Sequence, residues 1–178
     1  MAHLAYSSHS RLGLQLLAVV IGLFVLSPAM AKKSDRTQTM QLKQDSFSGS
    51  YLPNSITTLT GHVLVTQGST KLSGDLAKVY MGADQQMDRL VMTAKPAHIE
   101  EQNDNDQWMS GDAAQLDYDN VTGIAVLTGQ ATVRQHGQSD MHADKLTYNT
   151  QTYQVTGEGN TRITLQPKPA TAVPSDKN

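Results

Sequence analysis

The stretch that decides the fold is LTGHVLVTQ at residues 59–67, because it returns as LTGQATVRQ at residues 127–135. In both copies apolar side chains recur at every second position after the glycine, Val63 and Val65 in the first and Ala131 and Val133 in the second, the pattern of a strand with one buried face. A second motif also repeats: AQLDY at residues 114–118 returns as DKLTY at residues 144–148. Repeats of about thirty residues that contain paired strands predict stacked units, each covering the apolar edge of the next. The glycine after Leu-Thr is expected at a bulge or bend.

Shorter alternating stretches extend the pattern over most of the chain, and no long stretch keeps a helical period. Turn signals rich in Gly, Pro, Asn and Asp separate the stretches every eight to twelve residues or so. They predict turns at residues 52–55, 67–69, 73–75, 119–120, 136–138 and 157–160, and an exposed loop at residues 101–107. This spacing predicts an all-β sandwich, roll or barrel.

Composition excludes several classes of function. The 178 residues carry 14 Lys and Arg against 16 Asp and Glu, so a basic surface for nucleic acid is not expected. The absence of cysteine excludes a thiol nucleophile, a disulfide framework and a cysteine-based metal site. The sequence contains no P-loop, dinucleotide fingerprint or Gly-x-Ser-x-Gly motif. We therefore expect a binding protein without a cofactor, a metal or a catalytic site.

The N-terminus has the features of a secretory signal. Arg11 precedes an apolar run at residues 12–26, and the small-residue tripeptide Ala29-Met30-Ala31 follows it. This order predicts a signal peptide at residues 1–31 that is cleaved after Ala31; an uncleaved membrane anchor is the alternative. An exported, cysteine-free chain rich in Thr and Gln indicates a bacterial periplasmic protein.

Two rival classes stay open. An eight-stranded outer-membrane barrel would suit the length, but it needs aromatic girdles that the few aromatic residues do not supply. A secreted carbohydrate-binding or carbohydrate-active β-protein would use paired carboxylates, for which Asp75, Asp112, Asp117 and Asp144 are the candidates. Tyrosines and the one tryptophan could form its sugar platform. The four histidines after residue 31 lack the spacing of a metal site.

The order of these motifs resembles the OstA-like family of lipopolysaccharide-transport proteins, the family of LptA. The similarity is carried by residues 59–68, by Ala94-Lys95-Pro96-Ala97, and by residues 111–118 and 126–148. It implies a twisted antiparallel β-jellyroll over residues 32–166, made of two facing sheets and open at both ends. It leaves the strand register around residues 72–96 open.

The resemblance also implies a role and its residues. The role is a periplasmic carrier that bridges an inner-membrane export complex and an outer-membrane translocon and holds the acyl chains of lipid A in an apolar groove. Inward strand positions would line that groove: Met40, Leu42, Val63, Val65, Ile99, Leu116, Tyr118 and Val133. Alternation alone places all of these except Ile99 on apolar strand faces.

The two end strands are expected to pair with other chains, because an open roll leaves their backbone groups free. The resemblance implies self-association head to tail, and contact with an inner-membrane LptC-like protein and an outer-membrane LptD-like translocon. The edge positions are Gln38, Thr39, Gln41 and Lys43 at one end and Arg162, Thr164 and Gln166 at the other. Proline-rich residues 167–178 are expected to be a disordered tail.

Overall fold

The computed structural model describes residues 35–167. The predicted signal peptide, and the predicted tail apart from Pro167, lie outside this range. The elements within it are η1 (Asp35–Thr37), β1 (Met40–Lys43), β2 (Ser46–Gly49), β3 (Ile56–Gln67), β4 (Thr70–Met81), β5 (Met87–Gln102), β6 (Trp108–Asp119), β7 (Ile124–Gln135), β8 (Ser139–Asn149), β9 (Val155–Glu158) and β10 (Arg162–Leu165). None of the described residues belongs to a helix with the length and apolar character needed to cross a membrane.

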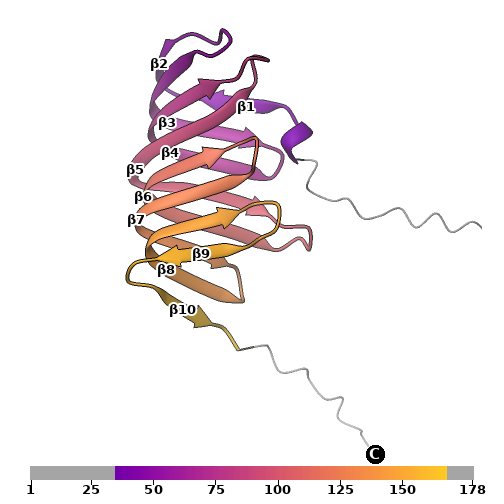
Figure 1. Cartoon of the computed structure of the whole chain (residues 1–178), viewed down its shortest axis with the longest axis vertical. Helices are drawn as coiled ribbons and strands as arrows, with labels where there is room; N and C mark the ends of the chain where they lie inside the picture. Colours follow the sequence, from indigo (N-terminus) through magenta and orange to yellow (C-terminus); the bar gives the residue numbers. More distant parts are fainter. Residues whose placement is uncertain (1–34, 168–178) are drawn as a thin grey trace, which may run out of the picture.

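The described strands form one antiparallel sheet in the order β1-β3-β4-β5-β6-β7-β8-β10, with β2 also pairing with β3 and β9 also pairing with β8. Figure 1 shows them stacked along the long axis, with β1 and β2 toward one end and β10 at the other. The predicted all-β antiparallel roll is therefore confirmed. Its two facing layers are halves of a single continuous sheet.

Each long strand bends near its middle, where its pairing is interrupted; the pair β4–β5 has a second register shift between Tyr80 and Met81. The register shifts between Thr60 and Val63 in β3 and between Thr128 and Ala131 in β7. At both places the backbone takes positive φ at a glycine and at the residue after it, with φ of 78° at Gly61 and 87° at Gly129. Glycine adopts this conformation without steric cost, so the repeated Leu-Thr-Gly places the bends. The predicted bulge is confirmed at both copies.

The bends divide the sheet into two walls. The first wall comprises β1, residues 63–67, 70–74, 97–102, 108–113, 131–135 and 139–143, and β10. The second wall comprises β2, residues 56–60, 76–81, 87–93, 115–119, 124–128 and 145–149, and β9. The hairpin turns of the two walls lie at their free ends, and we call the line along which these ends approach each other the seam.

The core lies between the walls. Its fully buried side chains come from both walls: Leu59, Leu116 and Leu127 of the second wall have no exposed surface, and Val63, Leu72 and Val133 of the first wall are 1% exposed. Burial of one such side chain is worth about 1.5–3 kcal/mol. The middle of the roll is therefore filled by its own side chains.

Two predicted connections are wrong, and the first half of a third lies in a strand, since Gly157 and Glu158 of the turn predicted at residues 157–160 belong to β9. Residues 73–75 do not form a turn; they lie inside β4, at the bulge between Ser73 and Leu76. The Ser-Gly-Asp sequence marks a bend within a strand, which uses the same residue types as a turn. The loop predicted from residue 101 begins only at Asn103, because β5 continues to Gln102 and buries Glu101.

Candidate functional site

The interior carries two rows of inward-facing side chains that run across the whole sheet, because directly paired residues share a face. The row of the first wall is Leu42, Val65, Leu72, Ile99, Gly111, Val133, Met141 and Ile163. The row of the second wall is Phe47, Leu59, Ala77, Met92, Leu116, Leu127, Leu146 and Gly157. We call them the inner rows. Both are wholly apolar from one edge strand to the other.

The eight predicted groove residues fall into two groups. Val63, Val65, Ile99, Leu116, Tyr118 and Val133 are at most 3% exposed and belong to the packed core. Met40 and Leu42 are half-buried in β1 and pack against the edge of that core. The structure thus places all eight along one interior, and the two residues in the edge strand border the groove at its N-terminal end.

That open space is a groove of about 550 Å³ at the N-terminal end of the roll. β1 contributes Met40 and Leu42, and the hairpin of β4 and β5 contributes Val79, Met81 and Met87 from the other wall. Methionine side chains are flexible and polarizable, so they adapt to irregular apolar partners. Sequence reasoning missed Met81 and Met87, although both occupy the ends of alternating stretches.

A smaller pocket of about 170 Å³, lined by both apolar and polar residues, lies at the C-terminal end. Met141 and Leu146 of β8 line it together with Val155 and Ile163 of the last strands. Ile163 is 65% exposed, and at the other end Phe47 is 60% exposed. Both side chains face inward but have no further strand beside them, so the inner rows end in exposed apolar surface at both edges.

The predicted edge residues lie where the sheet ends. β1 and β10 are the terminal strands of the described sheet, and Gln41, Lys43, Arg162 and Thr164 lie within them. The other three predicted edge residues flank the strands: Gln38 and Thr39 precede β1, and Gln166 follows β10. The amide of Gln166 donates a hydrogen bond to the carbonyl of Gln138 at 2.7 Å, which extends the pairing of β10 with β8 by one bond.

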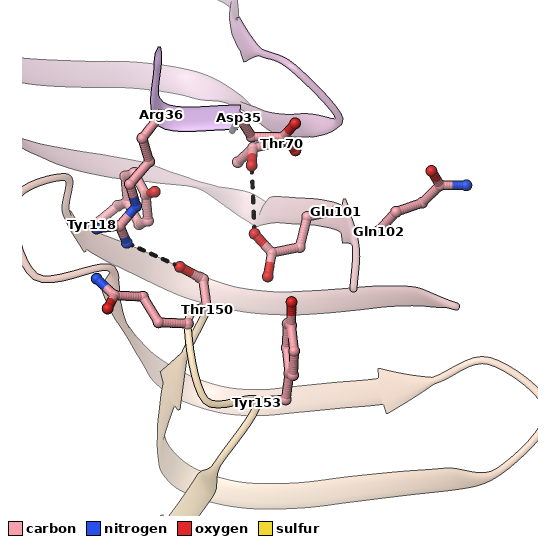
Figure 2. Close-up of a pocket in the computed structure, with 9 residues that line it drawn as sticks. Asp35, Arg36, Thr70, Glu101, Gln102, Tyr118, Thr150 and Tyr153 are labelled. Atoms are coloured by element: carbon pink, nitrogen blue, oxygen red, sulfur yellow. Dashed lines mark hydrogen bonds between the residues drawn. The ribbon is translucent and has the colours of Figure 1, made fainter. Parts of the chain in front are cut away.

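Polar side chains cross the seam midway along the roll, where they line a pocket of about 240 Å³ (Figure 2). We call Asp35, Arg36, Thr70, Glu101, Tyr118, Tyr148, Thr150 and Tyr153 the seam cluster. Glu101 of the first wall accepts a hydrogen bond from the hydroxyl of Tyr148 in the second wall at 2.6 Å, and Thr70 donates to its other oxygen at 3.3 Å. Sequence reasoning missed Glu101 because it ended the strand too early.

Burial dominates the electrostatics of this cluster. The loss of solvent raises the pKa of Glu101 to about 7, against the opposing effect of the hydrogen bonds from Tyr148 and Thr70. Burial, with the nearby Glu101 carboxylate, also raises the pKa of Tyr148. The carboxyl group of Glu101 therefore changes charge near neutral pH inside the seam.

The carbohydrate alternative gains no support from the geometry. Asp112 binds His98 and Arg134, Asp117 binds Arg89, and Asp144 accepts from Asn160. Burial by itself would raise the pKa of Asp112, but its two hydrogen bonds lower it overall. Tyr118 and Tyr148 are buried inside the roll, so neither offers an exposed face to a sugar. Within residues 35–167 no group of three or more His, Asp or Glu could hold a metal ion.

Comparison with known proteins identifies a family and several relatives. The family model described as "LptA/(LptD N-terminal domain) LPS transport protein" matches residues 34–154. The lipopolysaccharide export system protein LptA of Escherichia coli K12 is 34% identical over 122 residues, which are 68% of this chain and 65% of that protein. The export system protein LptH of Pseudomonas aeruginosa is 29% identical over 126 residues, 70% of this chain and 71% of the relative.

A solved structure agrees with the fold. The crystal structure of Pseudomonas aeruginosa LptH, described as the LptA-homologous periplasmic component of a lipopolysaccharide transport device, superposes with a TM-score of 0.69. The identity is 26%, and the match covers 75% of this chain and 99% of that one. The match to the Escherichia coli relative spans about two thirds of that protein's length. The family model covers most of the chain, and the chain therefore belongs to the LptA/LptD N-terminal domain family of lipopolysaccharide transport proteins.

Proposed function

We propose that this protein is a periplasmic lipopolysaccharide carrier that holds lipid A acyl chains between the two walls of its roll. The observation that carries the proposal is the pair of inner rows, which stay apolar from β1 and β2 to β9 and β10 and are exposed at both ends. Its relatives are named as lipopolysaccharide export proteins, and one is described as periplasmic. These names support a transport role without catalysis.

The energetics suit a carrier. Transfer of one methylene from water to an apolar site is worth about 0.8 kcal/mol, so several acyl chains supply ample binding energy. The groove beside Met40 and Leu42 offers the first contact, and entry further along requires the packed side chains of the middle to part. Equivalent apolar contacts along the inner rows let a chain slide, whereas one deep pocket would retain it.

Edge pairing would connect several such rolls into a bridge. The strands alternate in direction from β1 to β10, so β10 of one copy can pair antiparallel with β1 of the next. Ile163 would then continue the first-wall row toward Leu42 of the following copy. Such a head-to-tail contact does not close on itself and can extend. We propose the same edges for an inner-membrane LptC-like protein and an outer-membrane LptD-like translocon.

The lipid assignment is tested by photo-crosslinking to lipopolysaccharide from single positions of β1. Met40 and Leu42 are half-buried against the groove, whereas Gln41 and Lys43 of the same strand are exposed. A photoreactive residue at Met40 or Leu42 should give strong lipid adducts, and one at Gln41 or Lys43 should give few. Equal yields from all four positions would refute the groove.

The edge assignment is tested by sedimentation at rising protein concentration. Removal of residues 161–178 deletes β10 and should shift the protein toward monomer, while removal of residues 168–178 leaves β10 in place and should not. Unchanged self-association after removal of residues 161–178 would show that β10 does not form the contact between copies.

A further inference from the structure

We propose that the seam cluster is a closure that must open before a lipid with a large hydrated headgroup can move along the roll. The inference rests on the proposed function, because it concerns the path of the same lipid. Its basis is a set of hydrogen bonds that join the two walls at their free ends, together with the short segment η1 that bridges them. Figure 2 shows the hydrogen bond from Arg36 of η1 to Thr150.

The first fastening joins the walls directly. Glu101 lies on β5 in the first wall and Tyr148 lies on β8 in the second, and their side chains meet at 2.6 Å. Both residues are at most 5% exposed. The contact therefore joins the two walls directly, beside the pocket of about 240 Å³ that the seam cluster lines.

The second fastening is η1, which is tied to both walls. Asp35 accepts a hydrogen bond from the amide of Ser69 at 2.9 Å, and the carbonyl of Arg36 accepts one from Gln67 at 3.0 Å, both from the first wall. The Arg36 guanidinium donates to the Val121 carbonyl and to the Thr150 hydroxyl, each at 3.1 Å, in the second wall. This segment thus lies across the seam as a strap.

The third fastening joins the hairpin turns themselves. The amide of Asp104, in the turn between β5 and β6, donates to the hydroxyl of Tyr153 at 3.0 Å. Tyr153 follows β8 in the second wall. These three contacts lie at the level of strands β4 to β8, which we call the fastened level. It lies between the N-terminal groove and the C-terminal pocket, the two places where the inner rows are open.

The consequence follows from the chemistry of the cargo. Acyl chains gain by burial between the walls, whereas a glycan would lose its hydration there, so the headgroup has to stay outside the seam. A lipid that moves from one end to the other carries its headgroup along the seam and meets the fastened level. A fatty acid has no glycan to carry and is not stopped in this way.

The test uses the absence of native cysteine, which makes engineered pairs specific. Asn105→Cys with Thr152→Cys places one thiol in each of the turns that meet at Asp104 and Tyr153, both at exposed positions. A cleavable bis-maleimide then locks the seam. The matched control is Asn105→Cys with Gln138→Cys, since both turns belong to the first wall and are exposed.

Binding is measured with rough-type lipopolysaccharide and with palmitate. We expect the seam lock to weaken lipopolysaccharide binding at least tenfold and palmitate binding less than twofold, with recovery when the linker is cleaved. The control lock should change neither. Equal lipopolysaccharide binding by the two locked proteins would overturn the closure.

A second measurement separates the closure from the lipid assignment. Spin labels at residues 105 and 152 report the width of the seam without any lipid, and Tyr148→Phe should lengthen their distance relative to Tyr80→Phe, whose hydroxyl lies on the outer face. An unchanged distance distribution would refute the closure. If the unlocked protein fails to bind lipopolysaccharide while Tyr148→Phe widens the seam, the proposed function fails and the closure stands.

Discussion

Replacement of Glu101 by glutamine should remove the main source of stability loss between mildly acidic and neutral pH. Glu101 is only 5% exposed, and the titratable groups that face it are Tyr148, Tyr118, Tyr153 and the η1 residues Asp35 and Arg36. Burial outweighs the hydrogen bonds that favour its ionised form, so the folded chain holds this proton more tightly than the unfolded chain does.

The magnitude follows from the pKa. A rise from the ordinary value of 4.5 to about 7 corresponds to about 3 kcal/mol of stability. Because the folded form binds the extra proton, this contribution is fully present below pH 4.5. It declines as the pH rises and is absent above pH 7. Glutamine keeps an oxygen that accepts from Tyr148 but carries no titratable proton, so the decline should disappear.

The assay is urea unfolding between pH 4 and pH 8.5, followed by the fluorescence of the one tryptophan, Trp108. We compare the difference in unfolding free energy between the Glu101→Gln protein and the unmodified protein at the two ends of this range. That difference should be about 3 kcal/mol more favourable to the variant at pH 8.5 than at pH 4. Glu100→Gln is the matched control. A hydrogen bond from Lys71 lowers the pKa of Glu100, on the outer face of the same strand, so the stability that Glu100 contributes increases with pH instead of decreasing. Parallel pH profiles for the Glu101→Gln and unmodified proteins would refute the buried titration.

Two substitutions test the fold itself. Gly129→Ala should cost more than 1 kcal/mol, because φ is 87° there and a Cβ atom would lie 2.9 Å from that of Ala114. Gly137→Ala is the control, because Gly137 also has positive φ but an added Cβ atom would meet nothing within 4 Å. Thermal unfolding of both variants therefore separates crowding from backbone strain. Equal losses of stability in the two variants would refute crowding. Leu116→Ala, in the closed middle of the roll, should cost about 2–5 kcal/mol in urea unfolding. A loss below 1 kcal/mol would show that the middle is not packed.

Much of the fold could be predicted because its signals are local. Alternation in residues 63–67 and 131–135 sets which side chains face inward, and the repeated Leu-Thr-Gly sets where the strands bend. The burial patterns of the two copies, residues 57–67 and 125–135, agree position by position. A strand's inward face and a positive-φ glycine depend on a few neighbouring residues, so a sequence can carry them.

The candidate site was predicted only in part. Met40 and Leu42 were found because they alternate within one short strand, and they border the N-terminal groove. Met81 and Met87 complete that groove from another strand pair, and their proximity to β1 depends on how the two walls close. Alternation could have revealed Glu101, since it lies two residues after the inward-facing Ile99, but its place as the first residue of the polar run EQNDNDQ suggests a loop.

The sequence by itself determined the strands, their inward faces, their bends and the exclusion of cysteine-dependent chemistry. Only the tertiary structure decided that the middle of the roll is closed, that the inner rows open at both ends, and that Glu101 meets Tyr148 across the seam. The reason is distance along the chain: Glu101 and Tyr148 are 47 residues apart. Contacts between the walls depend on the angle at each bend and on side-chain volume, which no local pattern records.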